Sequence, residues 1–338
     1  MQRKLSEISS FEVILCLSVV LIHILSESIA AYAKGTVLSF LSFAASKMLT
    51  FVVPAFMISA GIKFAHKFEN TSFNYFTFIR GRITKIYLPY VIFTVLHYLY
   101  FVFYRRYFDF DIFKLFDYIM HGSIVAPFYF VALIMQFYIL SPIIMVFCRI
   151  IPSNLGIFIA AVINILCLKF SGGMKYGDRI FTVYHLYWTI GCYIGMDFRV
   201  AISRLARLKK VLVTLGIIFT IIYTVVSYCE FLELFNSFWT EILKMACCLS
   251  ASFMWLVLMP KSEGFIADNL APVTFYVFLI HCLVIIETQF WLTNWGITSI
   301  PLRFFITFFA TYIISLVVSI IFLKIKSLFV KSKQNGFW

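Results

Sequence analysis

Two histidines lie near the middle of long apolar segments, where ionisable side chains are rare. His23 is near the centre of SSFEVILCLSVVLIHILSESIAAYA, and His281 is near the centre of PVTFYVFLIHCLVIIETQF. An ionisable residue at membrane depth costs about 2.5 to 3.5 kcal/mol on insertion scales, so each histidine is a functional-site hypothesis. A neutral imidazole can act as a general base or carry an acyl group. The alternative for both residues is a hydrogen bond between packed helices.

A carboxylate follows the first histidine by one helical turn. Glu27 stands four residues after His23, so on a helix the two side chains share one face. The carboxylate could accept an N–H bond from the imidazole, fix its tautomer and raise its basicity. Alternatively, Glu27 faces the outer headgroups. We predict that the catalytic candidates are His23, Glu27 and His281.

Three cations are gathered in the segment FIRGRITKIYLPY. Arg80, Arg82 and Lys85 lie within about two helical turns, and Pro89 follows as a break or kink. Guanidinium groups bind phosphate in a bidentate manner, so this cluster could hold the phosphates of a soluble cofactor. The alternative is that the three residues only anchor the cytoplasmic end of a membrane span.

The composition of the 338 residues is that of an integral membrane protein. Hydrophobic residues make up 62% and charged residues 13%, which a water-soluble domain of this size could not present without aggregating. Apolar runs of about 20 residues argue against a barrel and favour all-α architecture. The sequence predicts about ten transmembrane helices. They lie near 11–33, 38–64, 86–104, 125–147, 154–170, 181–197, 211–230, 236–259, 271–292 and 302–323.

The basic residues predict the orientation of these spans. The net charge is +13, and ten spans place every basic cluster on one side, which the positive-inside rule makes cytoplasmic. Both termini are then cytoplasmic. Because the cations are spread over several loops, no nucleic-acid-binding face is expected. The clusters are Arg3 and Lys4; Arg80, Arg82 and Lys85; Arg199, Arg204, Arg207, Lys209 and Lys210; and Lys324, Lys326, Lys331 and Lys333.

We expect one integral-membrane domain over residues 1–338. No glycine-rich nucleotide loop, long linker or internal repeat interrupts the sequence. The eight cysteines lack metal-ligand spacing, so we expect small buried apolar residues and no metal site. SSFE at 9–12 has the pattern of a capping box at the start of the first helix. The outer loops 105–123 and 172–185 are amphipathic enough to form interfacial helices.

Several segments together resemble a known family. The mid-span His23, FIRGRITKIYLPY, FYFVALIMQFYILSPII, GCYIG and TFYVFLIH occur in the order and spacing of the bacterial membrane acyltransferase family 3. MQFYILSP is most similar to the branch of polysaccharide O-acyltransferases that contains the intercellular-adhesion C protein of poly-N-acetylglucosamine systems. The similarity covers nearly the whole chain. One departure is that the family commonly has Asp-x-x-Arg ahead of its histidine, where this chain has Ser9 and Glu12.

The resemblance implies a ten-helix enzyme of the cytoplasmic membrane. It would take an acyl group, with acetyl expected first, from cytoplasmic acyl-CoA to a hydroxyl of an envelope polysaccharide or its precursor. His23 would occupy the position of the family's essential histidine, and Arg80 and Arg82 would match its basic motif for acyl-CoA. Tyr276 and His281 match the late segment. The expected partners are acyl-CoA, the glycan, the lipid bilayer and glycan synthesis proteins, without a metal.

Two other functions fit a polytopic protein of this composition. An exporter or flippase for a polysaccharide or lipid-linked saccharide would usually leave an internal repeat or paired broken helices, and neither is visible. A membrane-embedded sensor or assembly partner would need none of these residues for turnover. The sequence leaves open the acyl group, the acceptor, the oligomeric state, and whether His23 acts as base or acyl carrier.

Overall fold

The computed structural model describes residues 5–69, 73–259 and 270–334. In these ranges the chain is mostly helical and contains no strand. Nine helical segments of the described residues are long and apolar enough to cross a membrane. The predicted class, an all-helical polytopic membrane protein, is confirmed. The predicted basic residues Arg3 and Lys4 lie outside the described residues.

The helices group into two compact units, which are described separately. Unit 1 comprises residues 1–49 and 260–338, and unit 2 comprises residues 50–259. The helices of unit 1 are α1 (Ser6–Ala31), α2 (Val37–Lys47), α13 (Ala271–Asn294) and α14 (Ile300–Gln334). The helices of unit 2 are α3 (Val52–Phe68), α4 (Tyr75–Arg82), α5 (Leu88–Leu99), α6 (Ile112–His121), α7 (Tyr129–Ile150), α8 (Ser153–Ser171), α9 (His185–Met196), α10 (Phe198–Arg207), α11 (Lys209–Phe231) and α12 (Phe238–Leu258). The expectation of one domain over 1–338 remains a prediction.

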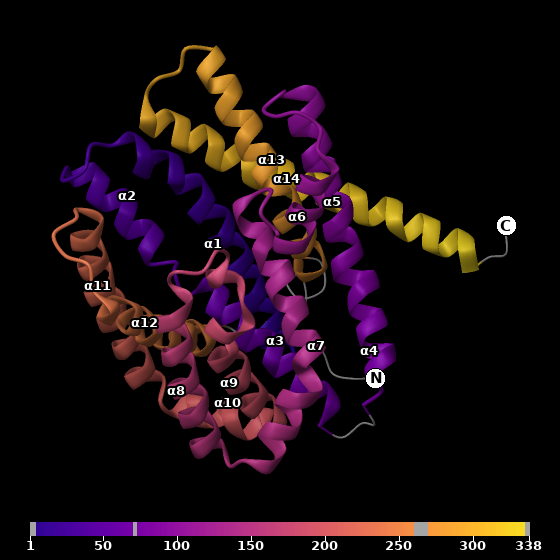
Figure 1. Cartoon of the computed structure of the whole chain (residues 1–338), viewed down its shortest axis with the longest axis vertical. Coiled ribbons are helices and arrows are strands. Elements are labelled where there is room, and N and C mark those ends of the chain that lie inside the picture. Colours follow the sequence, from indigo (N-terminus) through magenta and orange to yellow (C-terminus); the bar gives the residue numbers. More distant parts are fainter. Residues whose placement is uncertain (1–4, 70–72, 260–269, 335–338) are drawn as a thin grey trace. The chain divides into compact units, whose positions relative to one another are not determined.

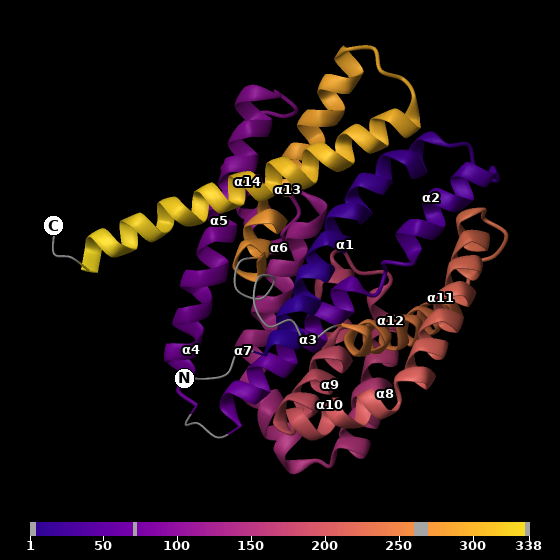
Figure 2. The same ribbon diagram turned by 180° about the vertical axis from the view of Figure 1, so that it is seen from behind.

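In unit 1 the first helix packs in parallel with α13 (Figures 1 and 2). The thiol of Cys16 donates to the backbone carbonyl of Thr274 at 3.3 Å. About two turns further along both helices, the rings of His23 and His281 meet. Because both contacts advance in the same direction, α1 and α13 run parallel.

The last helix of unit 1 runs in the opposite direction. The hydroxyl of Tyr312 donates to the carbonyl of Leu17 at 2.6 Å, whereas Arg303, earlier on α14, binds Glu27, later on α1. α14 is therefore antiparallel to α1, and it forms a hairpin with α13 (Figure 2). These three helices position the two mid-span histidines.

Glycines bring α3 and α9 together at the centre of unit 2 (Figure 1). A Cβ atom at Gly61 of α3 would lie 2.5 Å from the carbonyl oxygen of Trp188, and one at Gly191 would collide with the carbonyl of Ile58. Gly195, the last residue of GCYIG, faces the α3 backbone in the same way. Small residues spaced by four let helix backbones approach closely in a membrane. The GCYIG segment therefore serves helix packing.

Helix α7 contains a proline whose missing hydrogen bond is replaced locally. Pro142 cannot donate to the carbonyl of Tyr138, one turn before it. The hydroxyl of Ser141 donates to that carbonyl at 2.7 Å. Neighbouring hydroxyls commonly satisfy backbone groups freed by proline within membranes. The YILSP part of the sequence motif thus keeps α7 intact from Tyr129 to Ile150.

The structure departs from the sequence predictions in the number and shape of spans. The sixth predicted span, 181–197, is α9, a buried helix of 12 residues that is about 18 Å long and too short to cross alone. The span predicted at 38–64 is broken after Lys47, where α2 ends and a turn precedes α3. Close packing against α3 holds this short helix in place within unit 2.

Three local predictions can also be compared with the structure. The capping box at 9–12 is wrong, because α1 already begins at Ser6 and Ser9 lies within it. The predicted helix in loop 105–123 is confirmed as α6, whose N-cap Asp111 accepts from two backbone N–H groups. The predicted helix at 172–185 is wrong, because that loop forms two 3₁₀ turns at 177–179 and 181–183.

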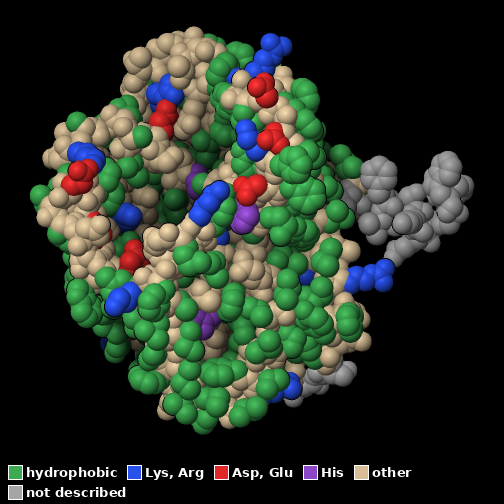
Figure 3. Space-filling model, viewed as in Figure 1, with side chains coloured by type: hydrophobic (Ala, Val, Ile, Leu, Met, Phe, Trp, Pro, Cys, Tyr) green, Lys and Arg blue, Asp and Glu red, His purple; other side chains and the backbone are tan. Residues whose placement is uncertain are grey.

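The surface of the helices is apolar, as a lipid environment requires. Figure 3 shows hydrophobic side chains over much of the face in view, with charged side chains in small groups among them. Beyond the first turn of α11 most of the exposed residues are aliphatic, and they include Ile217, Ile221 and Val225. Exposed apolar area on this scale marks a membrane contact.

We predict that Gly191→Ala lowers the free energy of unfolding by about 1 to 3 kcal/mol, because the added methyl group forces α3 and α9 apart. The measurement is denaturant or thermal unfolding of the purified protein in detergent. The matched control is Gly173→Ala, where a Cβ meets nothing within 4 Å. Equal stability of both variants would contradict close backbone contact between the two helices.

Candidate active site

Two imidazole rings meet inside unit 1. The ring centroids of His23 on α1 and His281 on α13 are 5.5 Å apart, and the rings are inclined by 41°. His281 is fully buried and His23 is partly buried. Both residues lie within segments apolar enough to span a membrane. The structure thus brings together the two histidines that the sequence singled out separately.

Backbone contacts fix the protonation of the His281 ring. Its Nδ1 atom lies 2.8 Å from the carbonyl oxygen of Phe278 and 3.2 Å from that of Val277. A carbonyl oxygen can only accept, so Nδ1 carries the proton and donates. In the neutral ring Nε2 then keeps its lone pair, and it lies 3.5 Å from the sulfur of Cys282. His281 is therefore held as an imidazole whose Nε2 is the acceptor nitrogen.

The carboxylate of Glu27 binds a cation of α14. Arg303 donates through Nε to Oε1 of Glu27 at 2.7 Å. The remaining guanidinium nitrogens donate to the carbonyls of Ile297 and Gln289 at 3.0 and 3.2 Å, and to the hydroxyl of Thr293 at 3.2 Å. Arg303 thus ties the ends of α1, α13 and α14 to one another.

This ion pair changes the interpretation of Glu27. The side chains of Glu27 and Arg303 are 24% and 13% exposed, so the pair is largely withdrawn from water. The spacing predicted that Glu27 orients His23. For that role the same carboxylate would have to accept from the imidazole as well as from the guanidinium. A catalytic role for Glu27 therefore stays a prediction. Sequence reasoning missed Arg303, although a carboxylate within an apolar helix demands a cationic partner, and Arg303 opens the last apolar run.

The basic cluster of unit 2 divides into two kinds of side chain. The guanidinium carbon of Arg82 lies 4.9 Å from the ring centroid of Phe78 and 4.7 Å from that of Tyr138 on α7. Arg82 therefore has a packing role through cation–π contacts. Arg80 and Lys85 are exposed. Lys85 lies in a turn of π-helix over Ile83–Tyr87 that leads from α4 into α5, and such turns are frequent at functional sites.

Two other mid-span polar residues bind backbone groups. The Nδ1 atom of the buried His97 lies 2.7 Å from the carbonyl of Phe93, one turn earlier. The side chain of Gln136 donates to the carbonyl of Arg179 at 2.9 Å and accepts from the backbone N–H of Phe181 at 3.0 Å. These contacts give both residues a role in packing.

The cysteines form no disulfide. All eight are free thiols, and most of them are buried. In the ranges that the structure describes, no three His, Cys, Asp or Glu side chains are grouped so as to hold a metal ion. The mid-span histidine pair is therefore the feature of unit 1 with the clearest acid–base capacity.

Comparison with known families defines the class of the protein. The model of the membrane acyltransferase family 3, described as an acyltransferase domain, matches residues 6–324. The chain belongs to this family and is a multi-pass membrane acyltransferase. No curated protein and no solved structure matches it. The matched range includes the histidine pair, the basic cluster and the α3–α9 contact.

We predict that Arg303→Met lowers the free energy of unfolding by about 1.5 to 3 kcal/mol, because it leaves the Glu27 carboxylate without its cationic donor. Combining it with Glu27→Gln should restore part of this loss, and a double-mutant cycle in detergent measures the coupling. Glu287→Gln, at an exposed contact with Trp291, is the control and should change stability by less than about 0.5 kcal/mol. Additive effects of the two substitutions would show that the ion pair contributes nothing.

Proposed function

We propose that this protein is an O-acyltransferase of the cytoplasmic membrane. It moves an acyl group, acetyl in the first instance, from cytoplasmic acyl-CoA to a hydroxyl of an envelope polysaccharide or its precursor. The observation that carries the proposal is the contact between His23 and His281 inside apolar helices of a chain that belongs to an acyltransferase family. The expected partners are the acyl donor, the glycan and the proteins that synthesise it.

His23 is the proposed general base. One ring nitrogen takes the proton of the acceptor hydroxyl while the oxygen attacks the carbonyl carbon of the thioester. The C–S bond of the tetrahedral intermediate then breaks, and the CoA thiolate takes the proton from the imidazolium. The products are the acylated glycan and CoA thiol, and His23 is again neutral. If His23 first carries the acyl group itself, the products are the same.

His281 is the proposed partner of the base. Its Nδ1 proton is donated to the carbonyl of Phe278, so Nε2 is the nitrogen whose lone pair can stabilise a positive charge on His23. Rings with centroids 5.5 Å apart are close enough for this effect. Burial of His281 strengthens it, because little water screens the interaction.

The basic cluster of unit 2 is the proposed site for the phosphates of the donor. Arg80 and Lys85 are exposed and can reach a ligand from the predicted cytoplasmic end of the spans. The guanidinium of Arg82, held between Phe78 and Tyr138, keeps this segment in place and adds its charge to the local field. The assignment follows the sequence resemblance and the exposure of the two outer cations.

We predict that His23→Ala lowers acyl transfer by at least about 100-fold, because general-base catalysis typically contributes 10² to 10⁴-fold. The measurement is transfer of labelled acetyl from acetyl-CoA to the envelope glycan fraction by membranes with matched expression. Ser26→Ala is the control on the same helix, since this hydroxyl only donates to the backbone carbonyl of residue 23.

Activity above about a tenth of wild type in His23→Ala would contradict the proposed base. Glu27→Gln should retain a slower reaction, since the amide still accepts hydrogen bonds but lacks the charge that stabilises imidazolium. If the rate falls by less than about twofold, Glu27 acts only through its ion pair with Arg303.

We predict that Arg80→Ala and Lys85→Ala each weaken acetyl-CoA binding by about three- to tenfold, since each removes one charge-assisted contact at a wet interface. Titration of the purified protein with acetyl-CoA measures this. Arg82→Lys should instead lower the thermal stability, because lysine cannot stack in the same planar manner on Phe78 and Tyr138. Lys209→Ala is the control, and unchanged affinity in all variants would reduce the cluster to a membrane anchor.

A further inference from the structure

Unit 2 contains a cavity that the proposed chemistry does not use. Its volume is about 640 Å³, within the range of about 300 to 1,000 Å³ that is typical of small-molecule sites. The walls come from the start of α7, the end of α8, the connection that leads into α9, the first half of α12, and the residues around the start of α3. The cavity lies wholly within unit 2.

The wall combines an ion pair with tyrosine rings. Glu241 and Lys244, one turn apart on α12, are joined by a bond of 3.1 Å between Oε2 and Nζ, and each side chain is more than 40% exposed. Tyr129, Tyr184 and Tyr187 line the cavity beside them. The wall therefore offers a cationic donor, carboxylate acceptors and hydroxyl groups next to flat apolar surfaces.

The charges of the wall select against a phosphorylated ligand. Asp178 and Glu241 face the cavity with Lys244 as their counterpart, so carboxylates outnumber cations among the residues that line it. An anionic phosphate would be repelled here, whereas a polyhydroxylated neutral molecule would find both donors and acceptors. A lipid chain would need neither the ion pair nor the hydroxyls.

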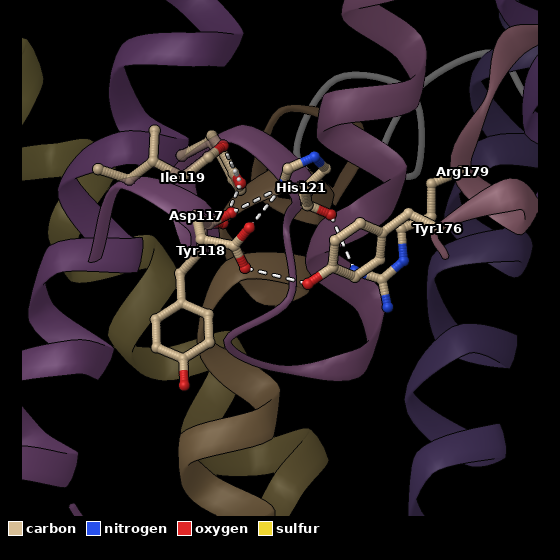
Figure 4. Close-up of polar contacts among 7 residues, drawn as sticks. Asp117, Tyr118, Ile119, His121, Tyr176 and Arg179 are labelled. Carbon is tan, nitrogen blue, oxygen red and sulfur yellow. Dashed lines mark hydrogen bonds and ion pairs between the residues drawn. The ribbon is translucent and has the colours of Figure 1, made fainter. Parts of the chain in front are cut away.

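A second network builds the wall that carries Asp178. Figure 4 shows Tyr176 beside His121, with ring centroids 4.3 Å apart, and its hydroxyl donates to Asp117 at 3.0 Å. Arg179 donates to the carbonyl of His121 at 2.9 Å and stacks on Tyr176. These contacts fasten the connection between α8 and α9 to α6.

The same connection is held from α7. The side chain of Gln136 binds the backbone of Arg179 and of Phe181, on either side of residue 180. The loop next to the cavity is therefore fixed by side chains from α6 and α7 in addition to its own two 3₁₀ turns. A cavity with a fixed polar wall is preorganised for a ligand, since less ordering is required on binding.

The cavity lies at the helix ends that the charge pattern predicts to be outside. α7 begins there and ends near the basic side at Arg149, and α8 starts at that basic side and ends at Ser171. Acidic residues gather in the loops and helix ends on this predicted outer side. They are Asp109, Asp111, Asp117, Asp178, Glu230, Glu233 and Glu241.

We propose that this cavity binds an uncharged segment of the acceptor glycan. Sugar hydroxyls would bind Lys244, Glu241 and Asp178, and the faces of the sugar rings would pack against the tyrosines. This proposal rests on the proposed function for its substrate class, but its binding step needs neither an acyl donor nor the histidine pair. Lys244 and Glu241, polar residues within a predicted span, thereby obtain a role as the polar wall of a site.

The test is saccharide binding by the full chain in lipid nanodiscs without acyl-CoA. Saturation-transfer-difference NMR with chitotetraose, cellotetraose and maltotetraose as probes gives the affinities. We predict that at least one of them binds, and that Lys244→Met weakens its binding about tenfold, as expected for loss of a charged hydrogen-bond donor. Asp178→Asn should weaken binding about threefold, and the fold tolerates it because this side chain is 69% exposed.

Two controls separate this proposal from the proposed function. Lys209→Met removes the same charge from an exposed position at the start of α11 and should bind the probe normally. His23→Ala should also bind it normally while it loses acyl transfer. Failure of all probes to bind, or unchanged affinity in Lys244→Met and Asp178→Asn, overturns the glycan site. Saccharide binding that depends on the cavity without any acyl transfer by the wild type overturns the proposed function alone.

Discussion

Polar groups in an apolar helix must find partners within the protein, and this constraint organises the structure. A lone charge at membrane depth costs several kcal/mol, whereas an ion pair with further hydrogen bonds recovers much of that cost. Glu27 and Arg303 satisfy the constraint for unit 1, because their bond joins α1 to α14 and the other guanidinium contacts include the end of α13. The same three helices hold the histidine pair, so the position of His23 relative to His281 depends on this network.

Unit 2 satisfies the constraint in a different way. Close contact of backbones at Gly61, Gly191 and Gly195 lets α3 and α9 pack without polar side chains. Elsewhere a side chain replaces a missing backbone donor. The hydroxyl of Ser141 donates to the carbonyl of Tyr138, which Pro142 cannot do. The candidate functional residues of unit 2 lie at the ends of its helices. One end carries Arg80 and Lys85, and the other carries the cavity with its ion pair.

These two solutions suit the proposed reaction between a charged donor and a neutral acceptor. Phosphate groups require an excess of cations at a wet interface, which the exposed part of the basic cluster offers. A neutral glycan requires balanced donors and acceptors beside flat apolar surfaces, which the cavity offers. The reacting hydroxyl requires a base away from bulk water, and His23 and His281 lie in apolar segments. Each chemical requirement thus has its own environment.

The sequence by itself determined the class of this protein and identified the residues that are candidates for catalysis. Hydropathy predicted the helices because a bilayer allows few other folds, and the isolated histidines were visible because ionisable residues are rare in apolar runs. The family assignment also follows from the order of motifs along the chain. Only the tertiary structure decided that α1 and α13 run in parallel with their histidines in contact, that Glu27 binds Arg303, and that Arg82 is held between two aromatic rings. The short helix α9 and the cavity were equally invisible, since both result from packing between segments distant in sequence, and local periodicity contains no information on which faces meet.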